Sequence, residues 1–527
     1  MRLSREFWLI LMAAFILRVG LAAFAPHPGV SDPNHYYNLG RNLASGRGFV
    51  IDYIYQYHRP PDAVTHPEDY WMPLPAIWPA LGLRLLGDSL WAALIPSAVL
   101  GTLLAVLTYG IAAAAGLEKP ARLIAMATAA FLPELVLNSV RTDTTLSYTL
   151  FGGLAALCFY LGVKHGRDAL FLLAGVAGGL THLSRQDGIL LAPAIAISML
   201  VLWRVGKHPM RWRWPLLIAL GWLIVLSPWL WRNQNVFGEW LPSGASRTLF
   251  MTSFNDQFTY GRELDLDHYL AWGWPNILGN IAFQALANVK TSYTVLDVAL
   301  PITAAIGLAD LVARRDRERL ALLLLPFVLA ALLYLFYSVL VPFHTMGGSF
   351  KKSYMVLVPF LAAASAWGVV EFVQPRRIGY LFAALMVVLM GLNAFELVRA
   401  DFNAAGRYDA TIAALGEMLC GAGDRNGDKA ITVMTQDPFI LNYHGFPALI
   451  IPSDDRDTIL EAAHRYGVDY IILPAARPAL DLLFDGAETD PRLTLIERAG
   501  SYYQLLAVEG APAVQPPTLF SVCDEAS

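Results

Sequence analysis

The sequence predicts an α-helical multi-pass membrane protein with a small α/β domain at its C-terminal end. Three observations lead to this fold class. The 527 residues are 56% hydrophobic and only 15% charged, which departs strongly from the balance of a soluble domain. Apolar segments long enough to cross about 30 Å of hydrocarbon recur along the first 400 residues. Beyond them, short helical and β-rich runs alternate and acidic residues accumulate.

About eleven segments are predicted to cross the membrane. They are roughly residues 7–25, 89–115, 121–138, 144–163, 169–183, 186–203, 214–231, 291–312, 320–341, 354–373 and 379–398. The weakest is 169–183, because about 15 residues rising 1.5 Å each fall short of a full span, and a tilted or re-entrant segment is the alternative. Residues 1–25 are interpreted as a retained helix rather than a cleaved signal peptide, since Arg18 interrupts the apolar stretch.

The basic residues of the short loops predict the orientation. With a cytoplasmic N-terminus, the cytoplasmic side receives the basic loops at 2–5, 119–122, 164–167, 204–213, 314–319 and 376–377. The long loops at 26–88 and 232–290, and the chain after residue 400, then lie outside. We therefore predict a plasma-membrane or inner-membrane protein with a transmembrane domain at 1–400 and an extracytoplasmic domain at 401–527.

Residues 401–527 have the composition of a globular α/β domain. Helical patterns near 408–420 and 456–466 alternate with β-rich runs at 430–435, 447–452, 469–474, 493–498 and 501–508. The first 400 residues carry a net charge of about +7 and the remainder about −11. An acidic outer domain argues against nucleic acid and anionic lipid as its partners. No Gly-rich phosphate loop follows a strand, so nothing predicts nucleotide binding there.

Three cysteines are too few for a disulfide framework. Cys158 lies within a predicted membrane helix and is expected to contribute to packing. Cys420 and Cys523 flank the outer domain, and the sequence leaves open whether they form a disulfide in an oxidising compartment.

The first outer loop opens with an acid at a predicted helix start. Asp32 precedes Pro33, which suits the first helical turn, and a short helical pattern then runs to Gly46. The helix dipole keeps such a carboxylate ionised and able to act as a base. A plain N-cap role is the alternative. The run 51–58 alternates with period two, which predicts an extended strand with Tyr55 and its alternate tyrosine neighbours on one face.

Ionisable residues gather, by this topology, on the outer face of the membrane. They are Asp32, His58, Arg59, His66, Asp143, Arg185, Arg232, Arg247, His344, Lys351 and Lys352. Asp143 in a helix-capping role and an Arg185–Asp187 ion pair are the structural alternatives. The outer face has no nucleotide supply, so a group-transfer enzyme there needs a lipid-borne donor. A polyprenyl-phosphate sugar fits, because its phosphate needs basic side chains and its acceptor hydroxyl needs a carboxylate base.

The order of these parts resembles the GT-C superfamily of membrane glycosyltransferases, especially the bacterial branch related to protein O-mannosyltransferases and the lipid A aminoarabinose transferase. The matching pieces extend over nearly all of residues 1–400. They are Leu17-Arg18, Asp32 with Tyr36 and Tyr37, Gly46-Arg47-Gly48-Phe49, Leu86-Gly87, Gly179-Leu180 through Arg185, Pro228-Trp229, Arg232-Asn233 and Phe237-Gly238. The resemblance implies that Asp32 is the essential carboxylate and that Asp143 is a second acid near the turn between the third and fourth helices.

The predicted function is inverting transfer of a sugar from a polyprenyl-phosphate donor to an acceptor hydroxyl on the outer face. Asp32 is the predicted general base, with Asp143 as a second catalytic acid. The residues assigned to the donor phosphate are Arg59, Arg185, Arg232, Arg247, His344, Lys351 and Lys352. Those assigned to the sugar or acceptor are Tyr36, Tyr37, Tyr55, His58 and His66. No metal or other cofactor is predicted, and the acceptor is a glycan, lipid or protein.

The alternative function is a transporter or flippase of a lipid-linked saccharide. Such a protein is expected to carry charged residues in the middle of its spans and inverted repeats. Arg18 is the main charge within a span, and no repeat is detected. The enzyme is therefore the favoured prediction.

Overall fold

The computed structural model describes the chain apart from residues 1–3, 206–210, 243, 342, 344–347, 374, 424–430, 476, 478, 500–502 and 511–527. The chain divides into two compact units, each assembled from three segments. The helical unit comprises Met1–Pro28, Trp71–Pro242 and Pro275–Asp401. The sheet unit comprises Gly29–Tyr70, Ser243–Trp274 and Phe402–Ser527.

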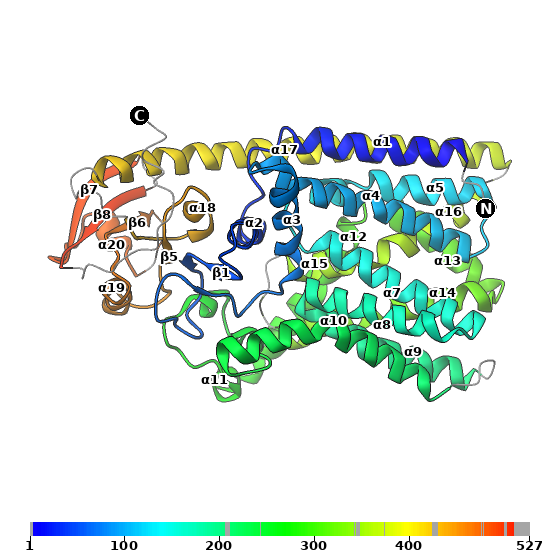
Figure 1. Ribbon diagram of the computed structural model, residues 1–527, viewed down its shortest axis with the longest axis horizontal. Helices are drawn as coiled ribbons and strands as arrows, with labels where there is room; N and C mark the ends of the chain where they lie inside the picture. Colours follow the sequence, from blue (N-terminus) through cyan, green and yellow to red (C-terminus); the bar gives the residue numbers. More distant parts are fainter. Residues whose placement is uncertain are drawn as a thin grey trace. The chain divides into compact units, whose positions relative to one another are not determined.

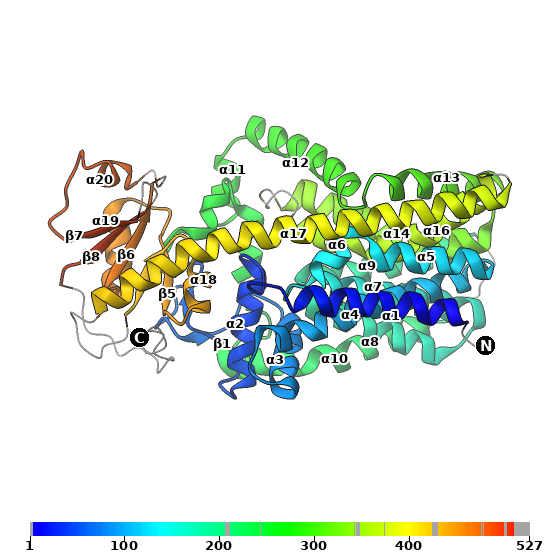
Figure 2. The same cartoon turned by 90° about the horizontal axis from the view of Figure 1, so that it is seen from above.

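The helical unit is a bundle of apolar helices (Figures 1 and 2). In it, α1 and α5 each pack on α4, and α7 and α10 each pack on α8. The elements are α1 (Arg5–Ala22), α3 (Leu74–Leu86), α4 (Leu90–Ala114), α5 (Lys119–Phe131), α6 (Pro133–Asn138), α7 (Thr145–His165), α8 (Asp168–Ser184), η1 (Gln186–Leu190), α9 (Leu191–Arg204), α10 (Arg213–Phe237), α12 (Trp274–Thr294), α13 (Ala299–Ala313), α14 (Arg317–Leu335), η4 (Phe336–Leu340), α15 (Ser349–Tyr354), η5 (Met355–Leu357), α16 (Val358–Phe372) and the part of α17 (Arg376–Gly423) that ends at Asp401.

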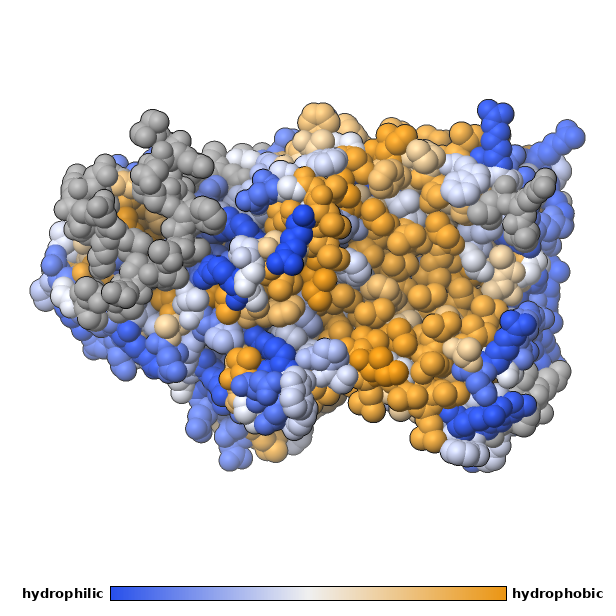
Figure 3. Space-filling view, viewed as in Figure 1, coloured by the Kyte–Doolittle hydropathy of each residue, from blue (hydrophilic) through white to orange (hydrophobic). Residues whose placement is uncertain are grey.

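Among the described residues, seven helices are long and apolar enough to cross a membrane. The pair α12–α13, bent by 94°, makes an eighth if it forms one span. Three other predicted spans, α1, α5 and α8, are less regular. Helix α1 carries Arg5, Glu6 and Arg18, α5 ends before Pro133, and α8 has only 17 residues. The visible face of the helical unit is broadly hydrophobic, as a membrane protein requires (Figure 3). The multi-pass fold is thus confirmed, while its orientation stays a prediction.

Glycines allow α8 and α10 to approach closely. A methyl group added at Gly175 would lie 2.1 Å from the carbonyl oxygen of Ile218, and one added at Gly221 would lie 2.3 Å from that of Leu172. Small residues at such crossings let membrane helices pack backbone to backbone. This crossing fixes the helix whose C-terminal end carries Arg185.

Helix α17 joins two elements that the sequence predicts separately. The expected span at 379–398 and the expected helix at 408–420 are parts of one helix of 48 residues. No proline interrupts this stretch, so nothing in it ends the helix.

The sheet unit is an α/β structure built around a six-stranded sheet. Its strand order is β2-β5-β4-β6-β8-β7; the first four strands are parallel, and β8 is antiparallel to both of its neighbours, β6 and β7. The elements are α2 (Asp32–Ala44), β1 (Val50–Ile51), β2 (Tyr53–Ile54), β3 (His66–Pro67), η2 (Gly244–Phe250), η3 (Phe254–Phe258), α11 (Leu266–Ala271), β4 (Val433–Thr435), α18 (Pro438–Tyr443), β5 (Ala448–Ile450), α19 (Arg456–Arg465), β6 (Tyr470–Pro474), α20 (Asp481–Phe484), β7 (Leu493–Ala499) and β8 (Tyr503–Val508). Strands β4 to β8 lie where the β-rich runs predict them.

The first outer loop contributes a strand to this sheet. Strand β2 pairs in parallel with β5, with Tyr53 opposite Ala448. One hydrophobic core contains Ile54 from the loop, Phe258 from the middle segment and Leu449 from the C-terminal segment. The sequence analysis groups the loop 26–88 with the transmembrane domain, whereas Gly29–Tyr70 belongs to the sheet unit because of this pairing. The strand expected over 51–58 is also shorter, since β2 has two residues.

The two cysteines among the described residues differ in their bonding. Cys158 is a free, buried thiol. Cys420 is disulfide-bonded. Cys523, the partner considered from the sequence, lies outside the described residues.

Candidate functional site

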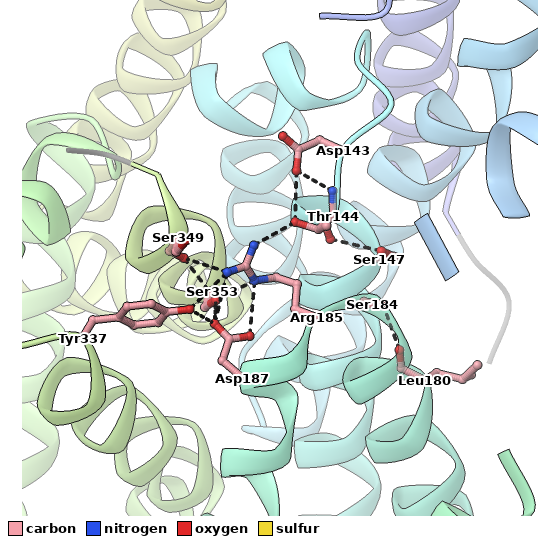
Figure 4. Close-up of polar contacts among 10 residues, drawn as sticks. All are labelled: Asp143, Thr144, Ser147, Leu180, Ser184, Arg185, Asp187, Tyr337, Ser349 and Ser353. Carbon is pink, nitrogen blue, oxygen red and sulfur yellow. Dashed lines mark hydrogen bonds and ion pairs between the residues drawn. The ribbon is translucent and has the colours of Figure 1, made fainter. Parts of the chain in front are cut away.

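A polar cluster lies at one end of several helices of the helical unit (Figure 4). Asp143 and Thr144 directly precede α7, and Arg185 links α8 to η1. The polar residues that contact Arg185 from other elements include Asp187 in η1, Tyr337 in η4, and Ser349 and Ser353 in α15. The cluster therefore joins parts of the chain that are far apart in sequence.

Arg185 is the centre of this cluster. Its Nε lies 3.2 Å from Oδ1 of Asp187 and its Nη2 lies 3.2 Å from Oδ2, so the ion pair is bidentate. Nε also donates to Ser353 Oγ at 2.9 Å, and Nη1 donates to Thr144 Oγ1 at 3.2 Å. Nη2 donates to Tyr337 OH at 3.1 Å. The ion pair that the sequence left as one of two alternatives is present.

Asp187 is satisfied from several directions. Beside Arg185, its Oδ2 accepts hydrogen bonds from the hydroxyl groups of Tyr337 and Ser353. The side chains of Asp187 and Arg185 are 3% and 12% exposed. A buried, fully bonded pair of this kind holds η1, η4 and α15 in a fixed relation.

Asp143 forms a second ion pair, with Lys352 of α15. Lys352 Nζ lies 2.9 Å from Oδ2 of Asp143, while Oδ1 accepts from the backbone N–H and the hydroxyl of Thr144. Burial raises the pKa of Asp143, but the charge of Lys352 and these hydrogen bonds outweigh burial and hold that pKa below its ordinary value. A carboxylate with a lowered pKa is a weak base, so the arrangement favours an electrostatic role for Asp143.

The neighbouring Lys351 pairs with a different acid. Its Nζ lies 2.7 Å from Oε1 of Glu134, and the same oxygen accepts from Asn138 Nδ2 at 3.1 Å. The lysine side chains retain some exposure, 26% for Lys351 and 16% for Lys352. Two consecutive cations thus stand at the start of the apolar stretch Ser349–Glu371, each held by an acid from the segment between α5 and α7.

Asp32 lies in the sheet unit, as the first residue of α2. The N-cap residue is Ser31 and not Asp32, and the side chain of Ser31 makes no capping hydrogen bond. Ser31 has a φ of 63°, which costs a non-glycine residue about 1–3 kcal/mol and is typical of functional sites. Burial, followed by the charge of Asp32, raises the pKa of both Tyr55 and Tyr70. The Asp32 carboxylate therefore lies within electrostatic reach of these two phenols.

The other predicted sugar or acceptor residues have mixed surroundings. Tyr36 and Tyr37 are 2% and 6% exposed, so their rings serve the interior of the protein rather than an open surface. Burial and then the charge of Arg247 lower the pKa of His58 to about 4, which leaves that imidazole neutral. His66 Nδ1 lies 2.9 Å from the carbonyl oxygen of Val64.

The remaining predicted phosphate ligands are distributed over both units. Arg247 donates from Nη1 to the carbonyl oxygen of His58 at 2.6 Å, within the sheet unit. Arg59 of the same unit is exposed. In the helical unit, the guanidinium of Arg232 lies 4.7 Å from the ring centre of Trp229 and 4.9 Å from that of Phe237. His344 lies outside the described residues. The structure thus brings Arg185, Lys351 and Lys352 together, with Asp143.

The comparisons with known proteins bear on the fold. The family model for dolichyl-phosphate-mannose-protein mannosyltransferases matches residues 65–231. The structure of ArnT from Cupriavidus metallidurans bound to undecaprenyl phosphate is 13% identical, with a TM-score of 0.55, and the match covers 97% of this chain and 100% of that one. The fold is that of the GT-C glycosyltransferases. The sequence-based resemblance is thereby confirmed.

Another solved structure matches with a similar TM-score. The Archaeoglobus fulgidus oligosaccharyltransferase in complex with zinc and sulfate is 15% identical, with a TM-score of 0.58, and the match covers 91% of this chain and 69% of that one. No curated protein sequence matches significantly. The residues covered by the family model include Asp143 and Arg185, whereas Asp32 precedes the matched range and Arg232 directly follows it.

The sequence analysis missed several residues of the polar cluster and of the lysine pairs beside it. Glu134 carries a signal, because an ionisable residue inside an apolar stretch usually faces a partner. Tyr337 and Ser353 carry no such signal in the sequence, since single hydroxyl groups are common in membrane helices. Among the described residues, no group of three or more His, Cys, Asp or Glu side chains is arranged to hold a metal ion.

Proposed function

We propose that this GT-C protein transfers a sugar from a polyprenyl-phosphate donor to an acceptor hydroxyl at the membrane surface. The observation that carries the proposal is the consecutive cations Lys351 and Lys352 at the start of the apolar stretch Ser349–Glu371. An anionic lipid head arriving at the end of that span meets two ammonium groups that are already oriented. The fold supports the same donor class, since the matching ArnT structure contains undecaprenyl phosphate.

The proposed roles follow from the chemistry of the leaving group. The acceptor oxygen forms a bond to the anomeric carbon while the bond from that carbon to the phosphate oxygen breaks. The electron pair leaves with polyprenyl phosphate, whose added negative charge is stabilised by Lys351 and Lys352. No acid has to protonate this leaving group. Asp143 is proposed to orient Lys352 through the 2.9 Å ion pair.

Asp32 is proposed as the general base that takes the proton of the acceptor hydroxyl. It is the first residue of α2, at the helix end where a negative charge is favourably placed. The strained Ser31 directly before it and the nearby Tyr55 and Tyr70 support a functional rather than a purely capping role. Displacement from the face opposite the phosphate would invert the anomeric centre.

The experiment uses the purified protein reconstituted in liposomes with a panel of undecaprenyl-phosphate-linked sugars and a mixed envelope extract as acceptor. Release of undecaprenyl phosphate is measured for the wild type and for Asp32→Asn. We expect release with at least one donor in the wild type and loss of release in the variant. Absence of release with every donor, or equal release by both proteins, contradicts the proposal.

A further inference from the structure

Helix α2 is held by the C-terminal segment within the sheet unit (Figures 1 and 2). Asn38 Nδ2 donates to the carbonyl oxygen of Phe439 at 3.0 Å, and Arg41 Nη2 donates to that of Asn442 at 3.3 Å. Both acceptors belong to α18. Asn38 is 1% exposed, so water cannot replace the hydrogen bond that its amide makes.

These contacts lie on the helix that begins with Asp32. His35, Asn38 and Arg41 follow Asp32 at intervals of three residues, and each step turns the side chain by about 60° around the helix, so the series follows no single face. The ring of His35 also packs edge-on against Phe439, with centroids 6.1 Å apart. Because α2 is one continuous helix, a shift of its contacts on α18 moves the Asp32 carboxylate as well.

The chain after α2 makes further contacts with the C-terminal segment. Beyond the pairing of β2 with β5, the hydroxyl of Tyr57 donates to the carbonyl oxygen of Ile450 at 2.6 Å. The hydroxyl of Tyr466, which directly follows α19, donates to the carbonyl oxygen of Pro61 at 2.8 Å. The C-terminal segment thus contacts the chain at α2, at Tyr57 and at Pro61. Residues of α18, of β5 and at the end of α19 make these contacts.

We infer that the C-terminal α/β segment is a positioning domain for Asp32, and that Asn38 and Arg41 are the positioning residues through which it acts. The inference rests on the proposed function, because it assigns to α18 the task of fixing the general base. It gives the acidic domain a role in the reaction that needs no ligand of its own.

The test compares the full-length variants Asn38→Leu and Arg41→Gln with the wild type. Asn38→Leu removes the amide at nearly constant volume, and Arg41→Gln changes a half-buried side chain that is less critical for folding. Arg492→Gln is the matched control, since it removes an exposed guanidinium that pairs with Asp457 and Asp490 in the same segment.

Two measurements are made on each protein. Hydrogen exchange of the amides of residues 32–44 is expected to accelerate in both test variants and to stay unchanged in the control. The turnover number is expected to fall about tenfold to a hundredfold, with the donor KM changed by less than about twofold, because a displaced base impairs chemistry rather than binding. Arg41→Lys, which keeps the charge and a donor, is expected to restore part of the turnover.

A double substitution isolates the effect on Asp32. In an Asp32→Glu background the base is already displaced, so adding Arg41→Gln is expected to cost less turnover than it does in the wild type. Unchanged exchange in both test variants, or equal losses of turnover in the two backgrounds, overturns the inference. If the wild type transfers no sugar, the proposed function fails, while the exchange measurement still decides whether α18 fixes α2.

Discussion

Lys352 Nζ lies 2.9 Å from Oδ2 of Asp143, and this contact joins α15 to the start of α7. The adjacent Lys351 makes a similar pair with Glu134 at 2.7 Å. Lysines at a predicted outer turn run against the charge distribution expected of a membrane protein. Their two acidic partners explain how they are accommodated, and their residual exposure leaves them able to meet an anionic lipid head.

Asp32→Asn is expected to abolish sugar transfer while leaving the fold intact. The change is isosteric, and a lost general base costs about 10²–10⁴-fold in rate. Turnover and thermal unfolding should be measured on the same preparation. Substantial activity in a folded Asp32→Asn protein would place the base elsewhere.

Lys351→Gln is expected to weaken the binding of undecaprenyl phosphate about tenfold, because one charge-assisted contact to the phosphate is lost. Arg232→Gln is expected to act in the same direction, with the unfolding temperature little changed in either variant. Lys164→Gln is the control, since it also removes a lysine–carboxylate pair, with Glu318, at a predicted cytoplasmic loop. Affinities equal to the wild type in both test variants would remove these two residues from the phosphate site.

Arg185→Met is expected to destabilise the protein by about 3–5 kcal/mol, because it leaves Asp187 buried without its cationic partner. Replacing both residues, in Arg185→Met with Asp187→Leu, is expected to recover part of that loss. Denaturant unfolding of the wild type and the two variants in detergent measures both effects. A single substitution that costs less than about 1 kcal/mol would contradict the interpretation of Arg185 as the centre of the cluster.

The stability of the sheet unit is expected to fall as the pH decreases from 6.5 towards 4. The pKa of His58 is lowered from 6.5 to about 4 by burial and then by Arg247, so in this window the unfolded chain binds a proton that the folded chain does not. The contribution of neutral His58 to the free energy of unfolding is therefore full above pH 6.5, and it is lost as the pH falls towards 4. His58→Gln should show a flatter dependence of the unfolding temperature on pH than the wild type. Parallel curves for the two proteins would mean that His58 titrates normally in the fold.

The local features of the fold were predictable, whereas the long-range contacts were not. Asp32 begins α2 because Asp-Pro is a local helix-start signal, and β6 at Tyr470–Pro474 coincides with a β-rich run. The pairing of Lys351 with Glu134 depends on how distant helices pack, and periodicity carries no information about that.

The same limit explains why Tyr37 was assigned to a ligand. Its ring packs edge-on against Tyr443, with centroids 5.4 Å apart, and that partner comes from the other end of the chain. A tyrosine beside a candidate catalytic acid looks available to substrate in the sequence, because its burial is supplied by residues that the local pattern does not include. The elements of the site were therefore predictable, but their partners were not.

The pairing of β2 with β5 has a consequence for biosynthesis. Tyr53 leaves the ribosome nearly 400 residues before Ala448, its partner in the ladder. At about 5–20 residues per second, roughly 20–80 s pass before the partner strand exists. During that interval the nascent outer loop has an unpaired edge and no completed core. The fold around α2 can therefore be completed only after β5 has been synthesised, and a chain terminated before Ala448 is expected to lack the partner of β2.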